Sequence, residues 1–227
     1  MQGDLVALGV PTDVVDPDRL ALQAALLAAT DLRRFGAAVR VLSQRLDAAQ
    51  AKLSSFDIGR HQHVCGLVAW RVDGAIFRAT RALNASIRAL SAGTERENRY
   101  LARVHDTFGQ MLHQQGMLAD ALGEYRTSLA LRDPERDRFG LAITHGNLGR
   151  LLMDVGNFRE AAEHLAVDLG IIGELDGSTR LRAQLTSHLA ECHLSLGAIA
   201  EAHELFSTSH ALAAADDVAS IFATLGL

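Results

Sequence analysis

The sequence predicts an all-α protein built from repeated helical hairpins. Alanine accounts for 37 of the 227 residues, whereas the chain has only three prolines and one tryptophan. Five segments align with one another without gaps, and their alanines recur every 40 to 42 residues, at Ala38, Ala79, Ala121, Ala161 and Ala202. No segment shows the alternation of apolar and polar residues that is typical of a strand.

Each aligned segment has the features of two helices joined by a tight turn. A large apolar residue precedes each alanine by three positions and another follows it by four, so that all three lie on one face of the second helix. In four of the five segments a glycine precedes the alanine by five positions, and it can end the first helix in the left-handed conformation. These glycines are Gly74, Gly116, Gly156 and Gly197, and Arg33 takes their place in the first segment.

In chain order, we expect helices over residues 17–33, 35–53, 57–72, 75–91, 95–115, 117–131, 134–155, 158–175, 179–196, 198–214 and 217–225. Typical capping residues stand at several of the starts. Asp16–Pro17 and Asp133–Pro134 each place an N-cap before a proline at the first helical position. Two pairs are spaced as capping boxes, Thr94 with Glu97 and Asn157 with Glu160. Asp216 or Asp217 is expected to cap the last helix.

Two of the segments carry the pattern of a known family. The third contains HDTFGQMLHQQGMLADALGEYRTSLALRDP, and the fourth contains HGNLGRLLMDVGNFREAAEHL. Both follow the large–small–large–Gly–aromatic–Ala–aromatic order of the tetratricopeptide repeat, which the chain resembles from about residue 17 to residue 215. The period of about 41 residues exceeds the usual period of about 34 by nearly two helical turns. Such long repeats resemble those of kinesin-light-chain-like proteins and of bacterial regulators with tetratricopeptide sensor arms.

The resemblance implies a right-handed α-solenoid of about five hairpins plus a C-terminal helix. We expect one domain over residues 1–227, with repeats over 17–56, 57–93, 94–133, 134–176 and 177–215 and a terminal helix over 217–225. The first two repeats fit less well, because Leu26 and Leu67 stand where a small residue is usual. The terminal helix is either the cap that a solenoid needs or the first helix of a sixth repeat in a longer protein.

Composition and charge exclude several classes of function. The net charge of −5 and the isoelectric point of about 6.0 argue against nucleic-acid binding through bulk positive charge. No run of about 18 apolar residues occurs, so we expect no membrane span. Residues 1–15 lack the basic and apolar regions of a secretion signal. We therefore expect a cytoplasmic protein whose two cysteines, Cys65 and Cys192, stay reduced.

The histidines and cysteines do not predict chemistry. His61 and Cys65 share a helix face, but His63 points elsewhere and no fourth ligand is near in sequence, so we expect no metal. His63, His105 and His145 fall at the same repeat position, which suggests either a pH-sensing histidine ladder or, as we favour, rings packed between helices. Nothing combines a nucleophile, a base and an oxyanion donor. We therefore expect no enzyme activity and no cofactor.

The resemblance also implies where a partner binds. In this family the first helix of each hairpin lines the concave surface, at positions 13, 10, 9, 6 and 3 before the turn glycine. Asn147 stands where peptide-binding members often hold an asparagine, whose amide can donate to and accept from a peptide backbone. The candidate groove residues are His61, Arg71, Arg103, Asp106, Gln110, Ile143, Asn147, Arg150, Met153 and His188. The three arginines favour an acidic, extended peptide.

The sequence therefore predicts a protein- or peptide-binding module, the interaction or sensor part of a bacterial signalling or regulatory protein. The bacterial origin is inferred from the high alanine content and from Lys52 being the only lysine, both typical of a GC-rich genome. Two alternatives stay open. One is a self-assembling scaffold that forms homo-oligomers through the ends of the solenoid. The other is the regulatory arm of an enzyme whose catalytic domain is absent from the chain.

Overall fold

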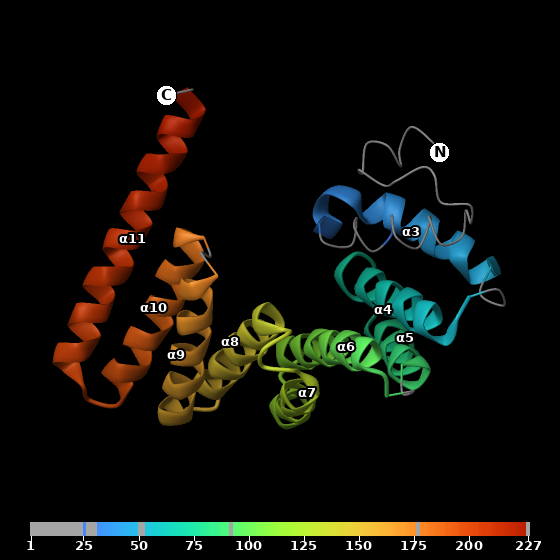
Figure 1. The fold of residues 1–227 in the computed structure, drawn as a ribbon, viewed down its shortest axis with the longest axis horizontal. Helices are drawn as coiled ribbons and strands as arrows, with labels where there is room; N and C mark the ends of the chain where they lie inside the picture. Colours follow the sequence, from blue (N-terminus) through green and yellow to red (C-terminus); the bar gives the residue numbers. More distant parts are fainter. Residues whose placement is uncertain (1–24, 26–30, 50–52, 91–92, 176–177, 226–227) are drawn as a thin grey trace. The chain divides into compact units, whose positions relative to one another are not determined.

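The computed structural model describes residues 25, 31–49, 53–90, 93–175 and 178–225. Within these ranges the regular elements are all helices, which confirms the all-α prediction (Figure 1). They are α3 (Leu32–Ala49), α4 (Ser55–Arg71), α5 (Ile76–Ala89), α6 (Glu95–Gln114), α7 (Leu118–Leu131), α8 (Arg138–Asp154), α9 (Phe158–Glu174), α10 (Thr179–Ser195) and α11 (Ile199–Leu225). The predicted helix 17–33 and its Asp16–Pro17 cap lie outside the described residues.

The helices group into two compact units, Met1–Met111 and Leu112–Leu227, with the boundary inside α6. In unit 1, α4 packs against α3 and α5. In unit 2, each helix from α7 to α11 packs against the next, and α8 also contacts α10. The prediction of one domain over residues 1–227 stays a prediction.

The repeat alanines of the second to fifth repeats are buried, as expected of residues at helix contacts. Ala79, Ala121 and Ala161 are completely buried, and Ala202 is 2% exposed. The first repeat departs from the pattern, because Ala38 is exposed while its neighbour Val39 is buried in the core of unit 1. The alignment of that repeat was therefore wrong by one residue.

The turn glycines end the first helices as predicted. Gly74, Gly116, Gly156 and Gly197 all have positive φ angles, between 65° and 79°. At the α8–α9 turn, the amide of Asn157 donates to the carbonyl of Leu152 over 2.8 Å, and the amide of Gly156 donates to that of Met153 over 3.0 Å. These bonds use carbonyls that the end of α8 leaves without a helical partner. A side chain with a Cβ would be strained at these φ values.

Helix α4 is rotated about its axis by one residue position relative to the first helices of later hairpins. Four residues, 72–75, separate α4 from α5, whereas three residues, 155–157, separate α8 from α9. Gly66 packs on Leu83 in α5 as Gly149 packs on Leu165 in α9, since a Cβ added at either glycine would lie 2.8 Å from the leucine Cδ2. Gly66 stands eight residues before its turn glycine and Gly149 stands seven before, so counting back from Gly74 misplaces every residue of α4.

The predicted helix starts were partly right. Thr94 and Glu97 form the capping box, because the Thr94 amide donates to Glu97 Oε2 over 3.1 Å and the Glu97 amide donates to Thr94 Oγ1 over 3.3 Å. Asn157 does not cap α9 with its side chain, which instead donates through Nδ2 to Glu160 Oε2 over 2.7 Å.

Two other helix boundaries differ from the prediction. Asp133–Pro134 opens a separate turn, in which Asp133 Oδ1 accepts from the amides of Glu135 and Arg136, and α8 starts only at Arg138. The expected break at Asp216 or Asp217 is absent, since α11 is one helix from Ile199 to Leu225. Acidic residues at the middle of a helix are tolerated when no glycine or proline interrupts it, and none stands near these two.

Candidate functional site

A pocket of about 410 Å³ lies on the first helices of three successive hairpins in unit 2. The end of α6 contributes His113 and Gln114, α8 contributes Arg150, Met153 and Asp154, and α10 contributes His188 and Glu191. These are the helices that the sequence predicts to carry the binding surface. Three predicted groove residues, Arg150, Met153 and His188, therefore lie together in one pocket.

The pocket mixes both signs of charge around an apolar side chain. His113 Nε2 lies 2.6 Å from Asp154 Oδ2, so the imidazole is held against a carboxylate that is 62% exposed. Arg150 is exposed, and Met153 is half-buried. Met153 has the same repeat position as His113, three residues before the turn glycine. The Nδ1 atom of His188 is buried without a hydrogen-bond partner among the described residues.

Two other predicted groove residues of unit 2 stand outside the pocket lining. Ile143 is 38% exposed, and Asn147, one helical turn further along α8, is 6% exposed. The Asn147 amide is therefore mostly covered, so any contact with a peptide backbone would use the small part of the side chain that reaches the surface.

A buried aspartate in α9 replaces a serine of the other repeats. Seven residues after the repeat alanine, α5 has Ser86, α7 has Ser128 and α11 has Ser209. Ser86 donates to the Gly59 carbonyl over 2.7 Å, and Ser209 donates to the Ala183 carbonyl over 2.8 Å. Each bond joins the second helix to the first helix of its own hairpin.

The aspartate at this position, Asp168, cannot make that bond when it is ionised. It is 5% exposed and lies against Gly146 in α8, where an added Cβ would collide with its Oδ2 atom. Burial raises the pKa of the Asp168 carboxyl to about 7, although the positive charge of Arg150 acts in the opposite direction. Near neutral pH this side chain therefore exchanges a proton.

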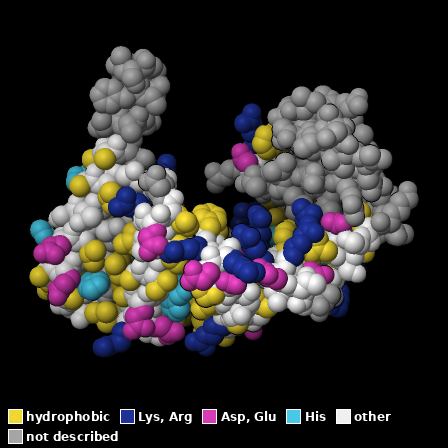
Figure 2. Space-filling view, in the orientation of Figure 1, with side chains coloured by type: hydrophobic (Ala, Val, Ile, Leu, Met, Phe, Trp, Pro, Cys, Tyr) yellow, Lys and Arg dark blue, Asp and Glu magenta, His cyan; other side chains and the backbone are white. Residues whose placement is uncertain are grey.

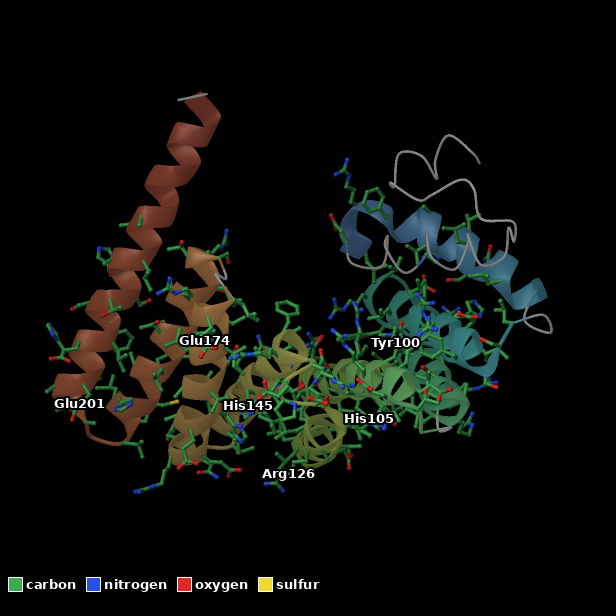
Figure 3. The ribbon with its side chains drawn as sticks, in the orientation of Figure 1. Tyr100, His105, Arg126, His145, Glu174 and Glu201 are labelled. Carbon is green, nitrogen blue, oxygen red and sulfur yellow. The ribbon has the colours of Figure 1, made fainter. Side chains whose placement is uncertain are left out.

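His145 of α8, labelled in Figure 3, is paired with His164 of α9. The Nδ1 atoms of the two rings lie 2.8 Å apart, and their ring centroids are separated by 4.9 Å. Burial lowers the pKa of His145 to about 4, with a further contribution from His164, and burial also lowers the pKa of His164. One neutral ring can donate to the other, whereas two protonated rings would repel each other.

The predicted groove residues of unit 1 do not share one environment. Arg71 is exposed and donates to Gln110 Oε1 over 3.0 Å, which links α4 to α6. Arg103 is exposed on α6, and Asp106 is only 4% exposed. The prediction for His61 was wrong. Because α4 is rotated by one residue position, the His61 side chain is completely buried against α3, where its Nε2 lies 3.1 Å from the Ser43 carbonyl oxygen.

Two histidines of the predicted ladder, His63 and His145, have hydrogen-bond partners outside it. In α4, the shifted register directs His63 to α6, with its Nδ1 3.1 Å from the Tyr100 hydroxyl and its Nε2 2.9 Å from Thr107 Oγ1. Burial, reinforced by Arg103 and Arg71, lowers the pKa of His63 to about 3. The ring is therefore a neutral packed group, the interpretation that the sequence favours.

The His61–Cys65 pair points away from His63. Cys65 Sγ lies 3.3 Å from His61 Nε2, while His63 bonds to residues of α6. No cluster of three or more metal-binding side chains occurs in the described part of the chain. In the same ranges, no helix is both long and apolar enough to cross a membrane.

Sequence reasoning missed two residues of the pocket, the partly exposed position of α4 that Arg60 takes, and the buried Asp168. Asp154 and Gln114 stand one position beyond the predicted groove positions, so widening the pattern by one residue would have included them. Arg60 was missed because counting from Gly74 placed His61 at the surface instead. Counting from Gly66 gives Arg60 the position that Arg103 has in the next repeat. Asp168 could have been found from the alignment, because three other repeats have serine at the same position.

Comparisons with known proteins agree with the repeat architecture. No protein-family model matches the chain. A stretch of 74 residues is 32% identical to the Tonsoku-like protein of Mus musculus, and this match covers 33% of the chain and 5% of that protein. The chain thus spans a small fraction of this curated relative.

Solved structures are similar over most of the chain. The apo form of RapI matches with a TM-score of 0.74 at 12% identity, over 86% of this chain and 71% of RapI. The TPR-like repeats of a putative kinesin light chain from Podosopora anserina match with a TM-score of 0.65 at 19% identity, over 88% and 98%. BtubC from P. vanneervenii matches with a TM-score of 0.58 at 13% identity, over 87% and 74%. The chain has the fold of TPR-like helical repeat proteins, as predicted.

Proposed function

We propose that the chain is a protein-interaction module that binds an extended peptide of a partner on the first helices of its hairpins. The observation that carries the proposal is the pocket of unit 2, because it draws on three successive repeats and lies where a peptide crossing the helices would contact each in turn. Helical repeat proteins commonly use such surfaces to bind other proteins. The fold similarity to RapI and to kinesin-light-chain repeats supports an interaction role without naming a partner.

The pocket suits a peptide that carries an acidic and an apolar side chain. Arg150 offers a guanidinium that can hold a carboxylate with two parallel hydrogen bonds, and Met153 offers an adaptable apolar contact. Asp154 and Glu191 surround them with negative charge, so a highly acidic ligand would be repelled at the rim. We therefore expect one carboxylate to bind at this pocket. The role proposed is that of an interaction or sensor part of a cytoplasmic bacterial regulatory protein.

The test compares the reversal of one charge in the pocket with the same reversal at an arginine of unit 2 that does not line the pocket. Arg150→Glu alters the pocket, whereas Arg159→Glu alters an exposed arginine on α9 by the same charge. Partners are captured from an extract of the source organism and identified by mass spectrometry, with far-UV circular dichroism as the check on folding. We expect Arg150→Glu to lose partners that the wild type and Arg159→Glu both retain. Equal capture by all three proteins would show that the pocket is not the binding site.

A second candidate function, self-assembly, is favoured by the open face of α11. Ile199 is 69% exposed and Phe206 is 37% exposed, whereas Leu165, which corresponds to Phe206 in the preceding repeat, is completely buried. A second copy stacked on α11 would cover these side chains. Light scattering after size exclusion distinguishes the candidates, since a scaffold gives an oligomer that Phe206→Glu dissociates. A monomer at all accessible concentrations would eliminate this function.

A further inference from the structure

Two aromatic rings and two arginines form a layered cluster where α4 and α6 of unit 1 meet. The rings of Phe56 and Tyr100 pack edge to face, with centroids 5.9 Å apart. The guanidinium of Arg60 lies over both rings, at 5.4 Å and 5.9 Å from their centroids, and that of Arg96 lies 4.2 Å from the centroid of Phe56. Stacking on a ring orients a guanidinium and leaves its N–H edge accessible to a ligand.

Arg103 adds a third positive charge to this cluster. Arg60 and Arg103 both act on the Tyr100 hydroxyl, since each opposes the rise of its pKa to about 12 that burial causes. Arg103 and Arg71 both act on His63, whose ring packs edge to face on Tyr100 at 5.6 Å. Arginines of α4 and α6 therefore place several positive charges near Tyr100. On the face of unit 1 seen in Figure 2, dark blue side chains gather over the region of α4 and α6.

Few carboxylates neutralise these arginines directly. Asp57 pairs with Arg60 at 3.4 Å. Glu97 is engaged by Thr94 in the capping box at the start of α6. Within the described residues of unit 1, no ion pair joins Arg96 or Arg103 to a carboxylate. Arg96 and Arg103 thus present exposed positive charges on this surface, in a chain whose net charge is −5.

We propose that Phe56, Arg60, Arg96, Tyr100 and Arg103, here called the arginine–aromatic face, bind an acidic segment of a partner protein. The inference rests on the proposed function and adds the chemistry of a second contact to it, on unit 1. Arginine pairs with carboxylates bidentately, and the ring faces offer apolar contact to the residues between the acids. A peptide is favoured over nucleic acid because only a short local patch is positive, whereas a nucleic acid carries a negative charge at every phosphate along its length.

The experiment uses the full chain and a synthetic fluorescein-labelled peptide in which Glu alternates with Ala. Binding is followed by fluorescence anisotropy, and a peptide with Gln in place of each Glu is the ligand control. The test variant is the double substitution Arg96→Gln with Arg103→Gln. The matched control is Arg81→Gln with Arg88→Gln, which removes the same charge from exposed positions on α5 of the same unit. Circular dichroism verifies that each variant stays helical.

We expect the wild type to bind the Glu peptide and not the Gln peptide. The test variant should lose about tenfold or more in affinity, while the matched control stays within about twofold of the wild type because surface charges away from a contact have small effects. Absence of binding to the Glu peptide, or equal losses in both variants, would overturn the inference. So would tighter binding of a single-stranded oligonucleotide than of the peptide. Failure here leaves the Arg150 experiment unaffected, since that experiment alters unit 2 and uses natural partners.

Discussion

Replacing Asp168 should stabilise the protein, and the gain should grow with pH. The carboxyl is buried, its ordinary pKa is 3.8, and burial raises this pKa to about 7. Because the folded state holds the proton more tightly than the unfolded state, folding stability falls as pH rises from about 4 to about 7. Asp168→Asn has no proton to lose and should not show this fall.

The size of the effect follows from the pKa shift. Each unit corresponds to about 1.4 kcal/mol, so complete ionisation of Asp168 costs the folded state on the order of 4 kcal/mol. Near pH 5 the cost is about 1.7 kcal/mol, because the unfolded chain has already lost most of its proton there. The advantage of Asp168→Asn over the wild type should therefore be about 2.5 kcal/mol larger at pH 8 than at pH 5.

Urea denaturation of both proteins at several pH values gives this difference directly. Any contact that asparagine gains or loses changes the stability difference by the same amount at every pH. The histidines titrate in both proteins. The pH-dependent part of the stability difference therefore belongs to the Asp168 carboxyl. Asp168→Ser is a second variant, since serine is the residue of three other repeats at this position. A stability difference that stays constant between pH 5 and pH 8 would refute the reasoning.

Two further predictions concern the packing and turns of the hairpins. Ala161→Leu should lower stability by about 1–3 kcal/mol because a completely buried contact with α8 has no room for the added atoms, and an unchanged urea midpoint would contradict the repeat alignment. Gly156→Ala should cost about 1 kcal/mol or more because the residue has a φ of 78°. Gly123→Ala, on the open face of α7, should instead raise the melting temperature through about 0.5–1 kcal/mol of added helix stability, and a loss in this control would show that strain is not the cause at Gly156.

The sequence sufficed for the order of helices, because glycine and alanine have few alternatives at the positions they occupy. Gly156 ends a helix with a positive φ that other residues rarely adopt, and Ala161 allows two helices to approach closely. Both requirements are local and recur in every hairpin of unit 2. A pattern counted along the chain can therefore find them without knowledge of the three-dimensional packing.

The candidate site was harder to predict because it depends on helix rotation. Arg150, Met153 and His188 line one pocket, since their helices keep the usual distance to the turn glycine, and their role in binding stays a prediction. His61 was misplaced and Arg60 was overlooked, since α4 does not keep that distance. The pairing of His145 with His164 and the burial of Asp168 depend on contacts between helices, which no single-helix pattern contains.

The additional residue between α4 and α5 has a consequence for how such arrays diversify. When one residue is inserted in a turn and the helix still ends at the same point, the preceding helix is rotated about its axis by about 100° relative to its partner. The same stretch of α4 would then present different side chains to a ligand without a single substitution within it. Here the insertion withdraws His61 and brings Arg60 to Tyr100. Turn length is thus a means of changing ligand specificity that leaves the composition of the helices intact.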